Sequence, residues 1–380
     1  MSSAGRPHAC PECLQRAWLI GSLAGHIENA VDRSVPGRRV HEVLALSNED
    51  LAEAMARSGA KDFLRRAEAR DREGMLETVA AARAWACCRH DPLYPAPLAD
   101  LGDPPAVLFC RGDRGMLSEV RAEGTVTIVG SRRPSSYGRG LARDLGREVA
   151  AAGLVVVSGM AMGIDARAHE GALEAGGLTL AVLGTGVDVP YPPRCTRLYE
   201  EIVERGLMVS ELPPGTLARR WTFPARNRIM AALGRMTVVV EARERSGSLI
   251  TAEMAQDLNR EVGAVPGRVG SSPAAGTNGL LRDGASVIRG APDVLDSILG
   301  VGAERPPPVI ARGPALDAEL AEVLDLVERG SSSADALARA SGLEPGPLAA
   351  ALVRLELGGY LRSDSGGRYE RTLLAAPESP

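Results

Sequence analysis

Aromatic residues and lysine are scarce in this sequence. Phe, Trp and Tyr together make up 3% of the 380 residues, and Lys61 is the only lysine. A surface on which nucleic-acid bases could stack must therefore be small, and nearly all positive charge comes from arginine. The formal net charge of −4 argues against a general basic coat for nucleic acid, but it is compatible with a local groove lined by arginine.

Long apolar runs and a cysteine framework are also missing. No run approaches the ~20 apolar residues that a membrane helix needs, and the start of the chain, Met1–Pro7, has no apolar stretch of the signal-peptide type. Six cysteines in a chain of this length are too few for a disulfide scaffold. We therefore expect a cytoplasmic protein without a membrane partner, divided into two or three domains.

The middle of the chain alternates regularly between apolar strands and amphipathic helices. Apolar, often β-branched runs predict strands over residues 126–129, 154–157, 178–183, 207–211, 237–241 and 261–265. Such continuous apolar strands, separated by helices, are typical of a mainly parallel α/β sheet that is covered on both faces. Residues 106–110 are predicted as an edge or leading strand ahead of this sheet.

The first two of these strands end in small, polar loops. The loop at 130–134 has the sequence Gly-Ser-Arg-Arg-Pro, and the loop at 158–163 begins with Ser-Gly. In open parallel sheets, ligands bind beyond the carboxyl ends of the strands, and N–H groups at the following helix starts favour anions. The dinucleotide pattern G-x-G-x-x-G is missing. The loops predict a site for phosphate or a nucleic-acid backbone, and an ordinary turn with solvated arginines is the alternative.

The strongest local signal is the segment 221–228, Trp-Thr-Phe-Pro-Ala-Arg-Asn-Arg. It places Phe223 just ahead of Arg226 and Arg228 at the start of a predicted helix. Arginine pairs phosphate groups through two parallel hydrogen bonds, and a phenyl ring stacks on any base. The segment therefore predicts contact with nucleic acid, and the alternative is a buried phenylalanine with arginines that support the fold.

Titratable residues in the loops are few. Asp165 and His169 are four positions apart on one predicted helix, a spacing that suits a general base and its orienting partner. The alternative is a carboxylate at a helix start and a hydrogen-bonded core histidine. No Ser/His/Asp set and no phosphate-binding Walker loop is found in the sequence.

Two cysteine groups have the residue types of a metal site. Cys10 and Cys13 have the spacing of a zinc knuckle, and Cys88 and His90 could supply two further ligands. Thiolate and imidazole suit zinc, which would fasten the N-terminus to the next domain as a structural cofactor. The alternative is a set of buried or free thiols, and elemental analysis for zinc distinguishes the two.

The regions that flank the sheet differ from it in pattern. Residues 1–85 predict a small domain of short helices, ahead of the sheet domain at 86–302, and a proline-rich stretch at 303–314 predicts a linker. Residues 315–373 combine three helical patterns with a hairpin, which predicts a winged helix. Its third helix has Arg354 as its only basic residue, whereas a duplex-reading helix presents several polar or basic side chains. We therefore favour a protein-contact role for this domain.

A set of motifs, in order over residues 92–300, resembles the DNA processing protein A (DprA/Smf) family. The motifs are Gly130-Ser131-Arg132, Ser158-Gly159-Met160-Ala161-x-Gly163-Ile164-Asp165-x-x-Ala168-His169, Phe223-x-x-Arg226-Asn227-Arg228, Val240-Glu241-Ala242, Ser246-Gly247-Ser248-Leu249-x-Thr251-Ala252, and Val265-Pro266-Gly267 with Gly276-x-Asn278-x-Leu280-x-x-Asp283-Gly284-Ala285. The resemblance implies an extended Rossmann-like core in a homodimer that binds single-stranded DNA without catalysis. It also implies that the protein protects incoming strands and loads the recombinase RecA during natural transformation.

The resemblance also implies a DNA pocket that includes Arg132, Phe223, Arg226 and Arg228. With the loop and motif residues added, the residues predicted to bind single-stranded DNA or its phosphates are Gly130, Ser131, Arg132, Ser158, Gly159, Gly163, Phe223, Arg226, Asn227, Arg228, Ser246, Gly247, Ser248 and Asn278. Two other functions are considered. A nucleotide or nucleoside glycosyl hydrolase could use Glu241 as its catalytic carboxylate beside Arg226, and a transcription factor could act through the winged helix. Preferential, salt-sensitive binding of single strands would favour the mediator.

Overall fold

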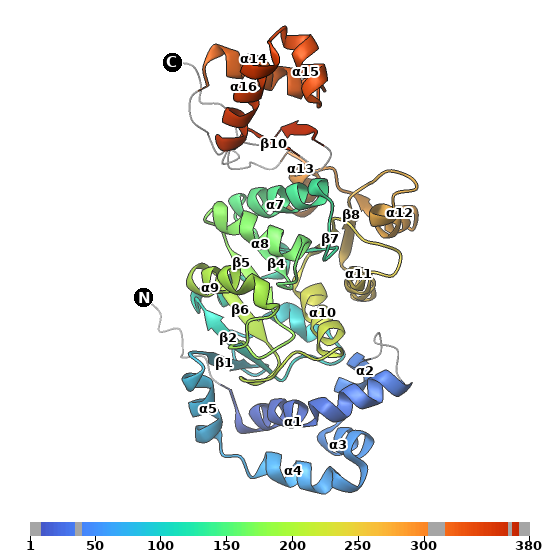
Figure 1. Cartoon of the computed structure of the whole chain (residues 1–380). Coiled ribbons are helices and arrows are strands. Elements are labelled where there is room, and N and C mark those ends of the chain that lie inside the picture. The colour runs from blue at the N-terminus through green and yellow to red at the C-terminus, as the bar shows by residue number, and fades with distance from the viewer. Residues whose placement is uncertain (1–8, 35–39, 303–315, 364–366, 372–380) are drawn as a thin grey trace. The chain divides into compact units, whose positions relative to one another are not determined.

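The computed structural model describes residues 9–34, 40–302, 316–363 and 367–371. These residues belong to two compact units, 1–306 and 307–380, which are shown in Figure 1. The linker predicted at 303–314 lies outside the described residues. Within the described part of the chain, no helix is both long and apolar enough to span a membrane.

The first unit is built on one mixed sheet, which contains nine strands among the described residues, in the order β1-β2-β6-β5-β4-β3-β7-β8-β9. The seven strands from β6 to β9 in this order are parallel, whereas β2 pairs antiparallel with both β1 and β6. The mainly parallel α/β sheet predicted from the sequence is thus confirmed. The strand bounds are β1 (Trp85–Cys88), β2 (Val107–Gly112), β3 (Thr125–Val129), β4 (Val155–Ser158), β5 (Thr179–Val182), β6 (Leu207–Ser210), β7 (Met236–Val239), β8 (Glu261–Ala264) and β9 (Ser286–Val287).

The central strands form because their side chains are apolar or β-branched on both faces. All residues of β3, β4, β5, β6 and β7 are buried. A buried hydroxyl such as that of Thr127 has its own partner, the carbonyl of Met230 at 2.8 Å.

The prediction for residues 106–110 was wrong in one respect, because β2 lies inside the sheet and the short strand β1 precedes it and forms the edge.

Helices cover both faces of the parallel part of the sheet. On one face, α7 (Ser136–Ala151), α8 (Ile164–Glu174) and α13 (Ala291–Leu299) share a hydrophobic cluster with β3, β4 and β7. On the other face, α10 (Thr222–Leu233) and α11 (Gly247–Asp257) pack on the same strands. Helices α7 and α8 pack closely because Gly146 and Gly171 have no side chain at their contact. A Cβ at either position would overlap the backbone of the other helix. Also in this unit, α9 (Thr196–Arg205) covers β5 and β6, and α6 (Gly115–Glu119) and α12 (Ala275–Arg282) lie in the connections.

The N-terminal helices pack directly against the antiparallel end of the sheet. Trp18 contacts Phe109 of β2 edge to face, with ring centroids 5.4 Å apart. Trp221, ahead of α10, is buried among N-terminal side chains and donates its indole N–H to the carbonyl of Ala24 at 2.9 Å. The N-terminal helices and the sheet therefore share hydrophobic clusters. The helices are α1 (Pro11–Ser34), α2 (Val40–Leu44), α3 (Asn48–Ala56), α4 (Ala60–Glu68) and α5 (Arg72–Ala81).

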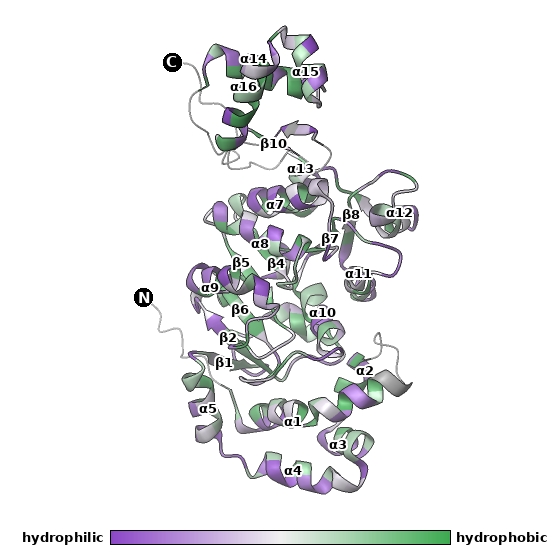
Figure 2. Ribbon diagram, in the orientation of Figure 1, coloured by the Kyte–Doolittle hydropathy of each residue, from purple (hydrophilic) through white to green (hydrophobic). Residues whose placement is uncertain are grey.

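The second unit has the order of elements that defines a winged helix. It consists of α14 (Ala318–Glu328), α15 (Ala334–Ser341), α16 (Pro345–Leu357) and a hairpin of β10 (Leu361–Ser363) and β11 (Tyr369–Arg371). Its core includes Leu324, Leu337, Leu352 and Tyr360. Much of α16 carries the hydrophobic colour in Figure 2, as the sequence of this third helix predicts.

Candidate nucleic-acid interface

The order of the strands creates a crevice at the carboxyl ends of β3 and β7. From β3, the chain proceeds through β4, β5 and β6 to one side of the sheet and through β7, β8 and β9 to the other. The loops after β3 and β7 therefore lead away from each other, which is where ligands bind in open α/β sheets. The backbone N–H of Ser131 donates to the carbonyl of Glu241 at 2.7 Å, so the two loops are joined at their base.

A pocket of about 720 Å³ opens above this crevice. It collects side chains from the loop after β3, the start of α10 and the loop between β7 and α11, so segments far apart in the sequence meet there. Among the sequence-predicted residues, those that line it are Gly130, Ser131, Arg132, Phe223, Arg226, Asn227, Ser246, Gly247 and Ser248.

The remaining glycine and serine residues predicted in the first two loops lie outside the lining of this pocket. Gly159 lines a smaller adjoining cavity together with Arg132 and Phe223. Ser158 is buried and donates its hydroxyl to the carbonyl of Ile128 at 2.6 Å. Gly163 precedes α8 with φ +91°, close to the backbone of Ser131, where an L side chain would be strained. Ser158 and Gly163 thus support the loops and are not among the residues that line the pocket.

Arginine dominates the charge of the pocket. The described lining includes a single acidic residue, Asp165, which is buried and accepts hydrogen bonds from the backbone N–H groups of Gly159 and Ala161. A chain with a net charge of −4 therefore has a concave surface with a local excess of positive charge, which attracts polyanions. The lining arginines are Arg132, Arg133, Arg220, Arg226, Arg243 and Arg245, and all except Arg226 are exposed.

Two aromatic rings lie together at the side of the pocket. The ring of Tyr191 is 5.3 Å from that of Phe223, and the guanidinium of Arg132 lies 5.5 Å from the centre of the Phe223 ring. Phe223 is half-buried and Tyr191 is 39% exposed. Sequence analysis missed Tyr191, although a tyrosine in a loop that follows a predicted parallel strand is a usable signal.

Arg226 lies at the bottom of the pocket. Its side chain is buried, and Nη1 donates to the carbonyl of Val182 at 2.6 Å. A Cβ on Gly159 would overlap the guanidinium, so the small residue in the motif leaves room for the arginine. Burial lowers the pKa of Arg226 to about 10, even though Asp165 favours the charged form. The group therefore remains positively charged at neutral pH.

Arg228 does not belong to the pocket, contrary to the sequence prediction. Residues two positions apart on a helix point about 200° from each other, so α10 directs Arg226 and Arg228 to different sides. Arg228 is buried in ion pairs with Asp103 and Glu211, each with an N–O distance of 2.7 Å. Burial alone would lower the pKa of Arg228, but the two carboxylates raise it. Of the two interpretations of this motif, the one in which its arginines support the fold therefore applies to Arg228.

Asn278 also lies outside the pocket lining. Its side-chain amide donates to the carbonyl of Gly267 and accepts from the N–H of Gly267, both at 3.1 Å. These bonds fix the loop before α12. Asn227, by contrast, lines the pocket and donates to the carbonyl of Gly247 at 3.3 Å, which ties the start of α10 to the loop after β7.

The candidate acids of the sequence are engaged in the fold. His169 is buried with Nδ1 2.7 Å from the hydroxyl of Thr179, and burial lowers its pKa to about 3. Asp165 instead contacts the backbone of the preceding loop, so the two do not form an acid–base pair. The carboxylate of Glu241 accepts hydrogen bonds from the N–H and the hydroxyl of Ser135, at the start of α7.

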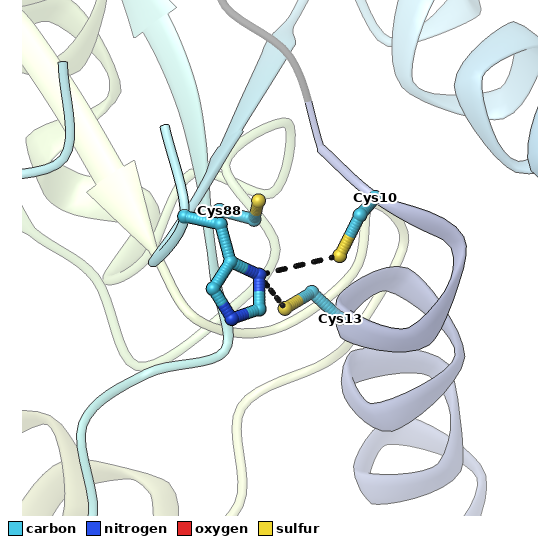
Figure 3. A group of neighbouring side chains, drawn as sticks. Cys10, Cys13 and Cys88 are labelled. Atoms are coloured by element: carbon cyan, nitrogen blue, oxygen red, sulfur yellow. Dashed lines mark hydrogen bonds between the residues drawn. The ribbon is translucent and has the colours of Figure 1, made fainter. Parts of the chain in front are cut away.

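The predicted metal ligands come together elsewhere in the first unit. The ligand atoms of Cys10, Cys13, Cys88 and His90 all lie within 4.8 Å of one another. Figure 3 shows the three cysteine side chains gathered between the start of α1 and the end of β1.

The architecture and the crevice place the chain among proteins that join a Rossmann-like α/β unit to a winged helix. Residues 85–299 match the family of the DNA recombination-mediator protein A, and residues 305–367 match the DprA winged helix domain. The chain belongs to the DNA recombination-mediator protein A (DprA/Smf) family, as the resemblance of its motifs predicts.

Individual relatives agree with this assignment. Protein Smf of Synechocystis is 34% identical over 315 residues, which are 74% of this chain and 78% of that protein. The X-ray structure of DNA processing protein A from Streptococcus pneumoniae has a TM-score of 0.59 and 32% identity, and covers 75% of this chain and 95% of its own. DNA processing protein A from Helicobacter pylori, whose structure concerns its single-stranded DNA binding mode, has a TM-score of 0.50 and 33% identity over 54% of this chain and 92% of its own.

Proposed function

We propose that this protein is a recombination mediator that binds single-stranded DNA in the pocket above β3 and β7. The observation that carries this proposal is that six arginines and the Phe223–Tyr191 pair line one pocket. Guanidinium groups pair with phosphates, and aromatic rings stack on bases that are free of a duplex. The Helicobacter pylori relative, with its single-stranded DNA binding mode, supports the same ligand.

The cellular role proposed for this binding follows the family. We infer that the protein protects incoming single strands and loads RecA during natural transformation or DNA uptake, and that it acts as a homodimer. Membership of a recombination-mediator family supports this role. A RecA ATPase assay on strands coated with single-strand-binding protein tests this role, because the coating delays the formation of RecA filaments. Addition of this protein is expected to shorten the delay.

We further propose that the protein acts without catalysis. The glycosyl hydrolase considered from the sequence needs a carboxylate that faces the ligand. Glu241 is bound to Ser135 and is outside the described lining of the pocket, and the carboxylate of Asp165 is buried against backbone N–H groups. Incubation with nucleoside monophosphates is expected to release no free base, and release would restore the hydrolase hypothesis.

Fluorescence anisotropy with labelled single strands and duplex of one sequence tests the pocket. We expect tighter binding of the single strand, weakened by salt, and a further decrease in affinity in a variant that combines Arg243→Ala with Arg245→Ala. The slope of log affinity against log salt should become shallower by roughly 0.7 for each phosphate that the variant no longer neutralises. The matched control combines Arg65→Ala with Arg66→Ala on α4, which removes the same charge from arginines that pair with Asp62.

Two results would contradict the proposed site. Equal decreases in affinity in both double variants would mean that total charge, and not the pocket, governs binding. Absence of single-strand binding by the unmodified protein would overturn the proposed ligand.

A further inference from the structure

Four side chains of metal-binding type lie together where the N-terminus meets the sheet. The distances from His90 Nδ1 to Cys10 Sγ and to Cys13 Sγ are both 3.5 Å. In a tetrahedral zinc site, with Zn–S near 2.3 Å and Zn–N near 2.05 Å, the sulfur-to-nitrogen edge is about 3.6 Å. These two sulfur-to-nitrogen distances are thus close to those around a bound zinc ion, and all four ligand atoms lie within 4.8 Å of one another.

Local structure explains why these four residues meet. Cys10 immediately precedes α1 and Cys13 lies in its first turn, so the two thiols are on the same side of the helix start. Cys88 ends β1, and His90 lies in the turn that follows. Because side chains alternate along a strand, Cys88 faces the α1 side of the sheet while its neighbour Cys87 packs into the cluster on the opposite face.

We propose that Cys10, Cys13, Cys88 and His90 bind one structural Zn²⁺ ion that fastens the start of α1 to the end of β1. Three sulfur ligands and one imidazole are a closed set of the kind found in structural zinc sites, in which no position is open for a substrate. Soft thiolate ligands favour zinc over magnesium or calcium. Cys13 and Cys88 are 2% and 0% exposed, whereas Cys10 is half-buried and His90 is exposed, so the ion would be covered on the side of the two buried cysteines and lie near the surface on the other.

Zinc would add a link between α1 and the antiparallel strands of the sheet, which are otherwise held together by hydrophobic packing. The same region contains the Trp18–Phe109 pair between α1 and β2 and a cluster that includes Met75 of α5. The ion would link segments far apart in the sequence, since His90 is 80 residues from Cys10 and 77 from Cys13. The four ligands come together only in the folded chain, so zinc binds the folded chain more tightly than the unfolded chain, and this difference in affinity adds to the free energy of unfolding.

The test uses the full chain, purified in reducing buffer without added metal. Elemental analysis is expected to find about one zinc per chain in the unmodified protein. Cys13→Ser should lose most of this zinc, whereas His90→Cys, which keeps four ligands, should retain it. Cys195→Ser is the matched control, because Cys195 is a partly buried thiol outside the cluster, and its zinc content should be unchanged.

A second measurement avoids dependence on variants that fail to fold. When a mercurial reagent titrates the thiols of the unmodified protein, a coloured zinc indicator should report release of the metal in step with thiol modification. Cobalt added to the zinc-free protein should give the intense visible absorption of tetrahedral cobalt with thiolate ligands. These readouts do not involve DNA, so they stand or fall separately from the proposed function.

Several results would overturn the zinc proposal. One is a protein without zinc that also fails to bind cobalt after reduction. Another is a Cys10–Cys13 disulfide in the intact protein, with no metal uptake once it is reduced. Retention of zinc by both Cys13→Ser and Cys88→Ser would place the metal at other residues and would equally reject this site.

Discussion

Six arginines line the pocket at the carboxyl edge of the sheet, whereas α16, the third helix of the winged unit, contains one. That arginine, Arg354, pairs with Asp317 at 2.7 Å. Around it, α16 exposes apolar side chains, with Val353 52% and Leu357 83% exposed. A helix that reads duplex DNA presents several basic or polar groups, and α16 does not.

The difference between the two regions shows that a fold name does not locate a binding surface. Helix-turn-helix units often bind DNA, and Rossmann-like sheets often bind nucleotides. In this chain the sheet unit has the local positive charge and the aromatic rings that single-stranded nucleic acid requires. The exposed apolar side chains of α16 are of the type that contacts proteins, and the protein-contact role favoured from the sequence stays a prediction.

The largest effect is expected for an arginine that belongs to neither surface. Arg228→Ala would leave Asp103 and Glu211 buried without their partner, and breaking a buried pair in this way costs about 3–5 kcal/mol of unfolding free energy. Thermal or urea unfolding should show this decrease directly. Arg228→Lys keeps the charge without the forked geometry, and its stability should fall between that of Arg228→Ala and that of the unmodified protein. If Arg228→Ala were as stable as the unmodified protein but bound DNA more weakly, Arg228 would belong to the DNA site after all.

Most of the fold can be predicted from the sequence, because the six central strands are continuous apolar runs between helical patterns. Strand β1 (Trp85–Cys88) is as long as β4 to β8, but it escapes prediction because it contains no β-branched residue and gains its place by pairing with β2. The two residues of β9 carry no periodic pattern. Pairing between distant segments, and not local preference, creates both strands.

The residues of the candidate site can be predicted only where their position does not depend on partners far away in the sequence. Arg132, Phe223 and Arg226 reach the pocket as expected. Arg228 differs because its carboxylate partner Asp103 lies 125 residues away in the sequence, so its burial cannot be read from the motif. Tyr191 likewise joins the pocket only because the loop after β5 folds against Phe223, and this contact cannot be read from the sequence.

A smaller effect, on DNA binding and not on stability, is expected for an exposed arginine of the pocket. Arg132→Ala should weaken single-strand binding by about 1.5–3 kcal/mol if its guanidinium pairs with a phosphate, with little change in unfolding free energy because the side chain is exposed. Arg132→Lys should recover only part of the affinity, since lysine lacks the planar fork. Anisotropy at two salt concentrations measures both. Affinity that is unchanged in Arg132→Ala would remove this loop from the DNA site.

A similar or smaller decrease is expected from the aromatic side of the pocket. Phe223→Ala should lower single-strand affinity by about 1–3 kcal/mol because a base can no longer stack on the ring, and it also removes the ring that Arg132 contacts. Phe223→Trp restores a flat aromatic surface and should recover binding. Unlike the arginine variants, Phe223→Ala should leave the salt slope nearly unchanged, because no phosphate contact is removed. A changed slope would show that the ring acts mainly by holding Arg132.

The smallest effect is expected in the winged unit, and it is the result that would break the comparison. Arg354→Ala removes a surface ion pair with Asp317, in which the two side chains are 57% and 49% exposed, so it should cost less than about 1 kcal/mol of stability. Single-strand and duplex affinities should both stay within error of the unmodified protein, while Arg243→Ala measured in parallel weakens single-strand binding. If Arg354→Ala weakened DNA binding as much as Arg243→Ala, α16 would have to lie along the bound strand. The apolar residues Val353 and Leu357 would then flank that DNA contact, and the assignment of α16 to a protein partner would fail.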